Sequence, residues 1–148
     1  MAMDITKSTL PELLQHISEL PASKKVDALR EIGNLKPALQ EALMLTYHNA
    51  IQFDLPPGVP PYKGTDMPEN WGYNRLPKEL RKFKYFVKGF NISPIKRESI
   101  FIELLESVSA EEAKLVIMIK DKKLTYKGIT KKVVMEAMPQ IFHGEVAE

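Results

Sequence analysis

Fourteen of the 21 basic residues lie in two short segments, and this clustering is the feature of the chain that most suggests chemistry. The segment 75–97 holds eight bases and one acid, and the segment 120–132 holds six bases and one acid. The remaining residues carry a net charge of −10, so the overall charge of +2 conceals two basic runs on an acidic background. Clusters of this kind attract polyanions such as nucleic acid. The alternative interpretation is a pair of solvated helix faces.

The second basic segment contains a turn with the features of a phosphate-binding site. Gly128 permits a backbone conformation that a side chain forbids, and Thr130 is a suitable cap for a following helix. A phosphate at that helix N-terminus would offset the unfavourable position of Lys131 and Lys132 at the positive end of the helix dipole. Helix-hairpin-helix elements present a similar turn to the nucleic acid backbone. An ordinary turn with both lysines in solvent is the alternative.

Catalytic and metal-binding motifs are missing from the sequence. The chain has no cysteine, which excludes disulfides, thiolate metal sites and cysteine nucleophiles. Its three histidines, His16, His48 and His143, are scattered and do not have the spacing of metal ligands. Neither a phosphate-binding Gly-rich loop nor a Gly-x-Ser-x-Gly elbow is present. We therefore predict a protein that is not an enzyme and that uses no cofactor or metal.

The elements that must position these residues are predicted to be helices throughout. A length of 148 residues with 44% apolar residues suits one soluble domain. Capping boxes at 9–12 and 109–112 mark two helix starts, and Gly33 and Asn34 are interpreted as a C-terminal cap and a following N-cap. Apolar residues recur at helical spacing over about 10–20, 23–33, 34–50, 77–89, 94–108, 110–119 and 131–138.

These segments predict an all-α fold, a single compact domain of six to seven helices over residues 9–142. The termini, 1–8 and 143–148, are expected to be flexible. The segment 51–76 interrupts the helices with five prolines and three glycines, so no helix runs through it. We predict a long ordered loop there, beginning with an extended arm laid on the helices. Its larger apolar side chains either cover the core or contact a protein partner, and the candidates are Phe53, Leu55, Tyr62, Trp71 and Tyr73.

Two resemblances rest on these motifs. The succession of Leu104-Leu105, the capping box, an apolar helix, basic residues, Gly128 and Thr130 resembles the N-terminal helical DNA-binding domain of ATP-dependent DNA ligases of phage and eukaryotic type. The chain from about 10 to 142 is also similar to a family of short uncharacterised proteins of T-even-like tailed phages of marine bacteria and cyanobacteria. That similarity lies in the Leu-Pro-x-Gly-x-Pro-Pro-Tyr arm at 55–62 and in the runs at 120–124 and 126–130.

The ligase resemblance implies a DNA-binding module without its catalytic domain, because the run 120–123 lacks the glycine of the ligase Lys-x-Asp-Gly motif. It implies binding of double-stranded DNA through the phosphate backbone, independent of sequence. The contacts that it implies are residues of the turn at 127–132, and further bases of the two segments lie beside them in the sequence. The candidate contacts are Arg81, Lys82, Lys84, Lys88, Lys96, Arg97, Lys120, Lys122, Lys123, Lys127, Gly128, Thr130, Lys131 and Lys132. The expected location is the cytoplasm of an infected bacterial host.

A protein–protein interaction module is the alternative function. The protein would then be a virion component, or a factor that docks on a host or phage enzyme through the aromatic, proline-rich arm. Neither function involves a membrane, because the longest strongly apolar stretch, Leu115–Ile119, is far too short to cross one.

Overall fold

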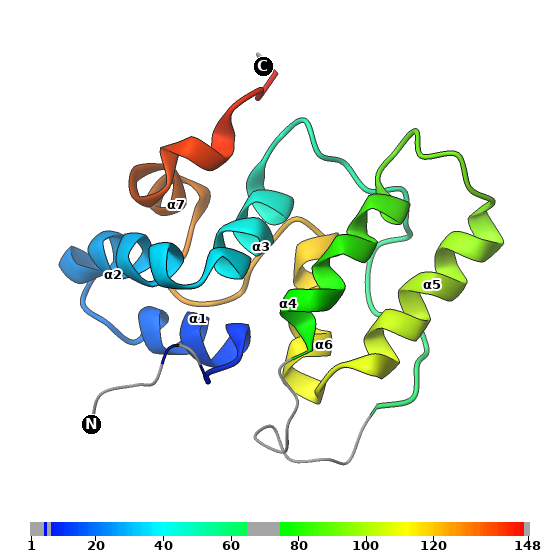
Figure 1. The fold of residues 1–148 in the computed structure, drawn as a ribbon, viewed down its shortest axis with the longest axis horizontal. Coiled ribbons are helices and arrows are strands. Elements are labelled where there is room, and N and C mark those ends of the chain that lie inside the picture. Colours follow the sequence, from blue (N-terminus) through cyan, green and yellow to red (C-terminus); the bar gives the residue numbers. More distant parts are fainter. Residues whose placement is uncertain (1–4, 6, 65–74, 147–148) are drawn as a thin grey trace.

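The computed structural model describes residue 5 and residues 7–64 and 75–146, and in these ranges every regular element is a helix (Figure 1). The all-α prediction is therefore confirmed. The elements, with η marking a 3₁₀ helix, are α1 (Leu10–Ser18), α2 (Ala22–Leu35), α3 (Pro37–Tyr47), α4 (Leu76–Glu79), η1 (Leu80–Phe86), α5 (Pro94–Ser107), α6 (Ala110–Lys120), α7 (Lys131–Ala137) and η2 (Pro139–Phe142).

Side-chain caps start several helices where the sequence predicts them. At α1, the Thr9 hydroxyl accepts from the Glu12 N–H while the Glu12 carboxylate accepts from the Thr9 N–H, which completes a capping box. Ser109 and Glu112 form the same box at α6. Ser93 and Thr130 cap α5 and α7 through their hydroxyl groups. Each cap satisfies N–H groups that a helix start leaves unpaired.

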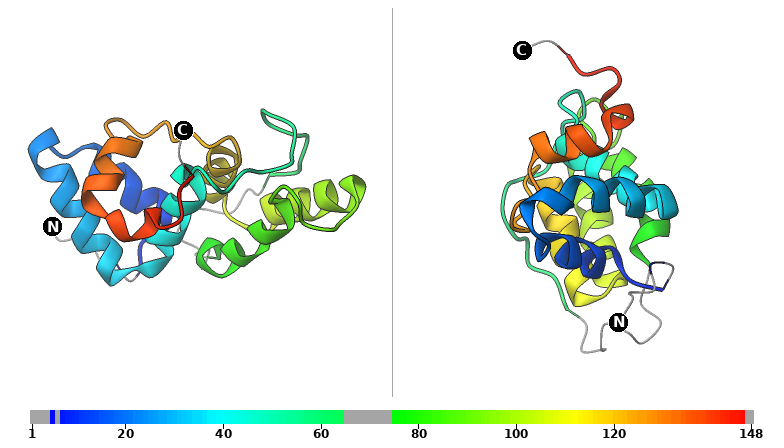
Figure 2. Two further views of the ribbon diagram at one scale, coloured as in Figure 1. Left: turned by 90° about the horizontal axis from the view of Figure 1, so that it is seen from above. Right: turned by 90° about the vertical axis from the view of Figure 1, so that its left-hand side faces the viewer.

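The central element is α6, as its apolar sequence predicts. Leu115, Val116 and Ile119 are fully buried, and the helix packs against α1, α3 and α5. Figure 1 shows α1, α2, α3 and α7 grouped on one side of the molecule, with η1 and α5 on the other. The view from above shows the same division, and α7 packs on α2 (Figure 2). One continuous core of buried side chains joins the two groups.

The boundary between α2 and α3 differs from the prediction. Gly33 does not end α2, which continues to Leu35, and Asn34 lies inside α2 and caps nothing. The residue before α3 is Lys36, without a side-chain cap, and Pro37 occupies the first turn. A Cβ at Gly33 would overlap the Cε of Met138. The lack of a side chain at Gly33 therefore leaves room for the side chain of Met138, which is distant in sequence. Close helix packing, and not a helix end, explains the glycine.

Residues 80–86 form a 3₁₀ helix instead of the expected α-helix. The apolar residues Leu80, Phe83 and Phe86 recur every three positions, and all three are buried. A 3₁₀ helix has three residues per turn, so this spacing places all three side chains on one face. The period of the apolar residues therefore matches the helix type that the chain adopts.

The described part of the arm, residues 51–64, meets the end of η1 at residues 52–54 and then continues to α5. Phe53 pairs with Val87 in an isolated antiparallel bridge, and the Asp54 N–H donates to the Phe86 carbonyl at 2.7 Å. Farther along, the Lys63 N–H donates to a Glu106 carboxylate oxygen at 2.7 Å. These bonds agree with the predicted arm laid on the helices. The rest of the predicted loop, 65–74, lies outside the described residues.

The C-terminal segment 143–146, part of the tail predicted to be flexible, makes several contacts with the rest of the chain. The Glu145 carboxylate accepts from the Asn49 N–H at 2.9 Å and from Lys131 Nζ at 2.8 Å. The Asn49 side chain bonds both the N–H and the carbonyl of Val146. His48, which is buried, places Nε2 2.6 Å from the His143 carbonyl oxygen. Polar side chains at the end of α3 thus hold the segment.

Candidate nucleic-acid interface

The structure does not bring the two basic segments together. In the view from above, η1 lies at the front edge of the helical core and the connection 121–130 runs across the back (Figure 2). The side view of the same figure separates them again. The bases of η1 and α5 and those of the 121–132 segment therefore belong to two surfaces, and each surface is considered separately below.

Arg97 acts inside the protein. Its side chain is buried, and its guanidinium donates to the carbonyl oxygens of Tyr85, Phe90 and Ile92 at 3.2–3.4 Å. It also forms an ion pair with Asp54 at 3.4 Å. A planar guanidinium with several fixed donors suits this task of holding one connection together. Arg97 fastens the segment between η1 and α5 to the arm.

Lys120 and Lys122 also bind the protein's own backbone. Lys120 is buried, and its Nζ donates to the carbonyls of Pro56 and Gly58 and pairs with Asp121 at 2.7 Å. Lys122 Nζ donates to three carbonyls at and after the end of α3, at 2.6–2.9 Å. Burial, followed by the neighbouring Lys131 charge, lowers the pKa of Lys122 to about 8.

Lys131 and Lys82 have acidic partners. Lys131 Nζ lies 2.8 Å from the Glu145 carboxylate, and Lys82 Nζ lies 2.6 Å from that of Glu79. The bond from Lys131, with that from the Asn49 N–H, lowers the pKa of Glu145. The charge of Lys131 at the start of α7 is thus offset by an acid of the same chain. No external phosphate is required for that purpose.

Seven of the predicted contact bases remain exposed. Four of them belong to η1, the connection after it and the first turn of α5, and three belong to the 121–132 segment. None has an ion pair with an acid in the described part of the chain. They are Arg81, Lys84, Lys88 and Lys96 on the first surface and Lys123, Lys127 and Lys132 on the second.

The 3₁₀ geometry of η1 sorts its side chains into rows. Because residues three apart eclipse in this helix, Arg81 and Lys84 share a second face, which is exposed, beside the face of the buried apolar row. Lys82 and Tyr85 share a third face, which borders α5. The helix therefore presents one row of bases to solvent and a second, mixed row to a neighbouring recess. The sequence shows that residues of one type recur every three positions in this segment. It does not show that the segment forms a 3₁₀ helix, in which such residues share a face.

The turn at 128–130 has the predicted backbone, and its glycine packs against a lysine side chain of α2. Gly128 has a positive φ of 76°, and Thr130 caps α7 by accepting from the Val133 N–H at 3.3 Å. A Cβ at Gly128 would meet the side chain of Lys25, which is buried and donates to the Leu20 carbonyl. Nothing in the sequence links these two residues. The glycine is explained by its φ and by this packing against α2.

The arm residues predicted as a protein contact surface divide between core and surface. Phe53 is buried and packs against Phe83, with ring centroids 5.6 Å apart, so it covers the core. Leu55 and Tyr62 are half-buried against the core. Trp71 and Tyr73 lie outside the described residues.

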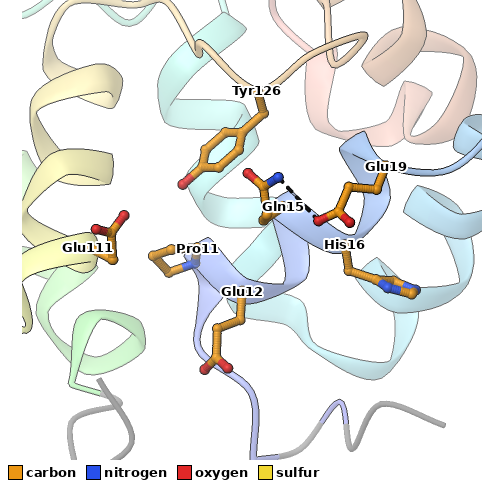
Figure 3. Close-up of a pocket in the computed structure, with 7 residues that line it drawn as sticks. All are labelled: Pro11, Glu12, Gln15, His16, Glu19, Glu111 and Tyr126. Atoms are coloured by element: carbon orange, nitrogen blue, oxygen red, sulfur yellow. Dashed lines mark hydrogen bonds between the residues drawn. The ribbon is translucent and has the colours of Figure 1, made fainter. Parts of the chain in front are cut away.

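A recess with several acidic residues in its lining lies beside Tyr126 of the connection 121–130 (Figure 3). Glu12 and Glu19 from α1, Glu111 from α6 and Tyr126 from the connection 121–130 contribute to its lining. The carboxylates have partners within the protein, since Glu12 completes the α1 capping box, Glu19 accepts from Gln15 and Glu111 pairs with Lys114. A polyanion approaching the 121–132 segment would meet these acids, so this side is less suited to DNA.

The described residues offer neither a metal site nor a membrane-spanning helix. Among the described residues, no three His, Cys, Asp or Glu side chains gather closely enough to hold a metal ion. No helix in the described ranges has the length and apolar character needed to cross a membrane.

Comparison with known proteins places the chain in a family. The family of unknown function DUF6433 matches residues 13–126, which is more than half of the sequence, and the chain belongs to it. The match runs from α1 through α6 to Tyr126, so it includes the first basic surface and the arm. Comparison with curated proteins and with solved structures found no match for the chain.

Proposed function

We propose that the protein binds double-stranded DNA through the phosphate backbone, without reading sequence and without catalysing a reaction. The observation that carries this proposal is a group of four exposed bases on η1, the connection after it and the first turn of α5, none of which has an ion pair among the described residues: Arg81, Lys84, Lys88 and Lys96. Only Glu79 brings a negative charge to the segment 75–97, and it is paired with Lys82. Lysine and arginine side chains in this setting release counterions from DNA.

The two surfaces support the proposal unequally. On the η1 side, the exposed bases stand on a short rigid helix whose apolar row is buried in the core. On the other side, Lys122 and Lys131 are engaged within the protein and an acidic recess lies beside the turn. The η1 surface is therefore the proposed DNA contact. The resemblance to tailed-phage proteins and to the ligase DNA-binding domain extends the proposal to a DNA accessory protein acting in the infected host.

The salt dependence of binding tests this function. Binding of the full chain to a short duplex of mixed sequence, followed by fluorescence anisotropy over a salt series, should weaken steeply. If four phosphates are neutralised, the log–log slope should be roughly −3 to −4. A second duplex of unrelated sequence should give the same constants. A flat salt response, or no binding at low salt, would contradict the proposal.

A protein–protein module remains the second candidate, because one apolar recess favours it. The arm 55–61 and α5 enclose about 410 Å³, lined largely by proline and other apolar side chains. Val59 nearby is 70% exposed, and Ile95 at the start of α5 is 83% exposed. Co-purification of a phage or host protein that survives nuclease treatment and is lost in Val59→Asp would support this function. Co-purification that nuclease treatment abolishes would instead favour DNA.

A further inference from the structure

A recess between η1 and α5 joins the proposed DNA surface to an exposed aromatic pair. It measures about 400 Å³, and its lining includes Lys82, Tyr85, Phe90, Lys96 and Glu103. Tyr85 and Phe90 meet edge to face, with ring centroids 5.3 Å apart and ring planes at 88°. Phe90 nevertheless leaves 39% of its surface in solvent, although a phenylalanine of this size is usually covered.

The backbone that carries the aromatic pair is firmly held. Arg97, from α5, donates to the carbonyls of Tyr85 and Phe90 themselves and to that of Ile92. The Phe90 N–H donates to the Val87 carbonyl at 3.1 Å, which closes the turn. A surface that is already ordered loses little conformational freedom when it binds. The buried arginine thus gives the exposed ring a fixed position.

Positive charge surrounds this ring pair. Lys82 and Lys96 line the recess itself, and Lys84 Nζ lies 5.1 Å from the centroid of the Tyr85 ring. Lys88 is exposed on the turn that leads to Phe90. Among the described residues that line the recess, Glu103 is the one with a carboxylate. This group adds a hydrogen-bond acceptor. Aromatic faces set among lysines are the arrangement with which proteins hold unpaired bases and their phosphates.

We infer that this recess binds an unpaired nucleobase of a DNA strand, stacked on the exposed Phe90 ring, which Tyr85 supports from the side, while the surrounding lysines hold the adjoining phosphates. The inference rests on the proposed DNA binding and adds a preference to it. DNA in which a single-stranded segment adjoins a duplex should bind more tightly than the fully paired duplex. A base inside a duplex is stacked and paired on both sides and cannot enter the recess.

The test compares three DNAs with the full chain, by fluorescence anisotropy at one salt concentration. They are a blunt duplex, the same duplex with a single-stranded extension, and that extension with abasic sites in place of bases. The extended DNA should bind roughly tenfold more tightly than the blunt one, because stacking on aromatic rings contributes this much per base. The abasic extension keeps the phosphates but should lose the gain.

Variants separate stacking from charge and folding. Phe90→Ala should abolish the gain from the extension and leave binding of the blunt duplex unchanged, while Phe90→Trp should retain the gain. Met135→Ala, at a similarly exposed apolar position on α7, is the matched control and should change neither. Salt-dependent binding of the blunt duplex without any gain from the extension would overturn the inference and leave the proposed function intact. Failure of all three DNAs to bind would overturn both.

Discussion

At the residue scale, several of the basic residues bind groups of the protein itself. Lys122 is the clearest case, because its Nζ reaches the carbonyls of Leu45, His48 and Ile51. The end of a helix leaves carbonyl groups unpaired, and an ammonium group there both donates to them and faces the negative end of the dipole. Its backbone φ of 59° turns the chain so that the side chain returns to α3.

Removal of this group should destabilise the protein. We expect Lys122→Met to lower the free energy of unfolding by about 2 kcal/mol, because a charged donor to backbone carbonyls contributes on that order. Lys123→Met, one position later and exposed, is the matched control and should have almost no effect. Urea denaturation of both variants checks the difference. Equal stabilities of the two variants would contradict this role for Lys122.

The same lysine should give stability a dependence on pH. Its pKa is about 8 in the folded protein and about 10.5 in the unfolded chain, so the unfolded chain binds more protons between these values. The contribution of Lys122 to the free energy of unfolding therefore rises as pH increases from 8 to 10.5. The difference in the free energy of unfolding between wild type and Lys122→Met should therefore grow across this range, as denaturation of both proteins would show. Parallel curves for the two proteins would be the opposing result.

At the scale of elements, Glu112 joins two helices that are far apart in sequence. It is fully buried, and one carboxylate oxygen completes the α6 capping box while the other accepts from the Leu76 N–H at 3.0 Å. Glu112→Ala leaves two buried N–H groups without a partner and should cost about 3 kcal/mol of stability. Glu112→Gln keeps an acceptor oxygen and should cost less. Thermal unfolding of both variants measures the order, and a reversed order would refute this account.

The two turn glycines make a second prediction at this scale. Gly89 and Gly128 both have positive φ, but a Cβ at Gly89 meets nothing within 4 Å whereas one at Gly128 meets Lys25. Gly89→Ala should cost about 1 kcal/mol for the strained backbone. Gly128→Ala should cost about 1 kcal/mol more, because the bond from Lys25 to Leu20 is disturbed as well. Chemical denaturation resolves this difference, and equal costs would show that the Lys25 contact is unimportant.

The sequence predicts most elements because their signals are local. Both capping boxes, the apolar run of α6 and the prolines in first turns act within a few residues, and the structure has them as expected. The 3₁₀ form of η1 was missed because apolar spacings of three and of 3.6 differ little over seven residues. Gly33 was misinterpreted because its partner, Met138, is distant in sequence.

The candidate site was only partly predictable for the same reason. The bases of the two segments were visible as a cluster, but their partners come from elsewhere in the chain. Lys120 bonds the arm and Lys131 bonds the C-terminal segment. Charge counts along a sequence contain no information about such tertiary contacts or about which side of the core a segment occupies. Which of these bases are exposed depends on how the helices pack in three dimensions.

At the scale of the whole molecule, the docked C-terminal segment should respond to acid. The pKa of Glu145 is lowered by its bonds to Lys131 and the Asn49 N–H, so its stabilising contribution is full above the ordinary value of 4.5. It is lost as pH falls through the lowered pKa of the folded state. The difference in melting temperature between wild type and Glu145→Gln should therefore be constant near neutrality and shrink in acid. A difference that persists unchanged in acid would argue against this contact.

The two-sided arrangement of bases makes the central claim directly testable. The triple variant Lys84→Glu, Lys88→Glu, Lys96→Glu alters the η1 surface, and Lys123→Glu, Lys127→Glu, Lys132→Glu makes the same change in net charge on the other side. All six positions are exposed, so both variants should fold. The measurement is the affinity of each variant for the same duplex DNA at low salt. We predict a loss of roughly a hundredfold or more for the first triple and a few-fold for the second. Equal losses, or a larger loss for the second triple, would contradict the assignment of DNA binding to the η1 surface.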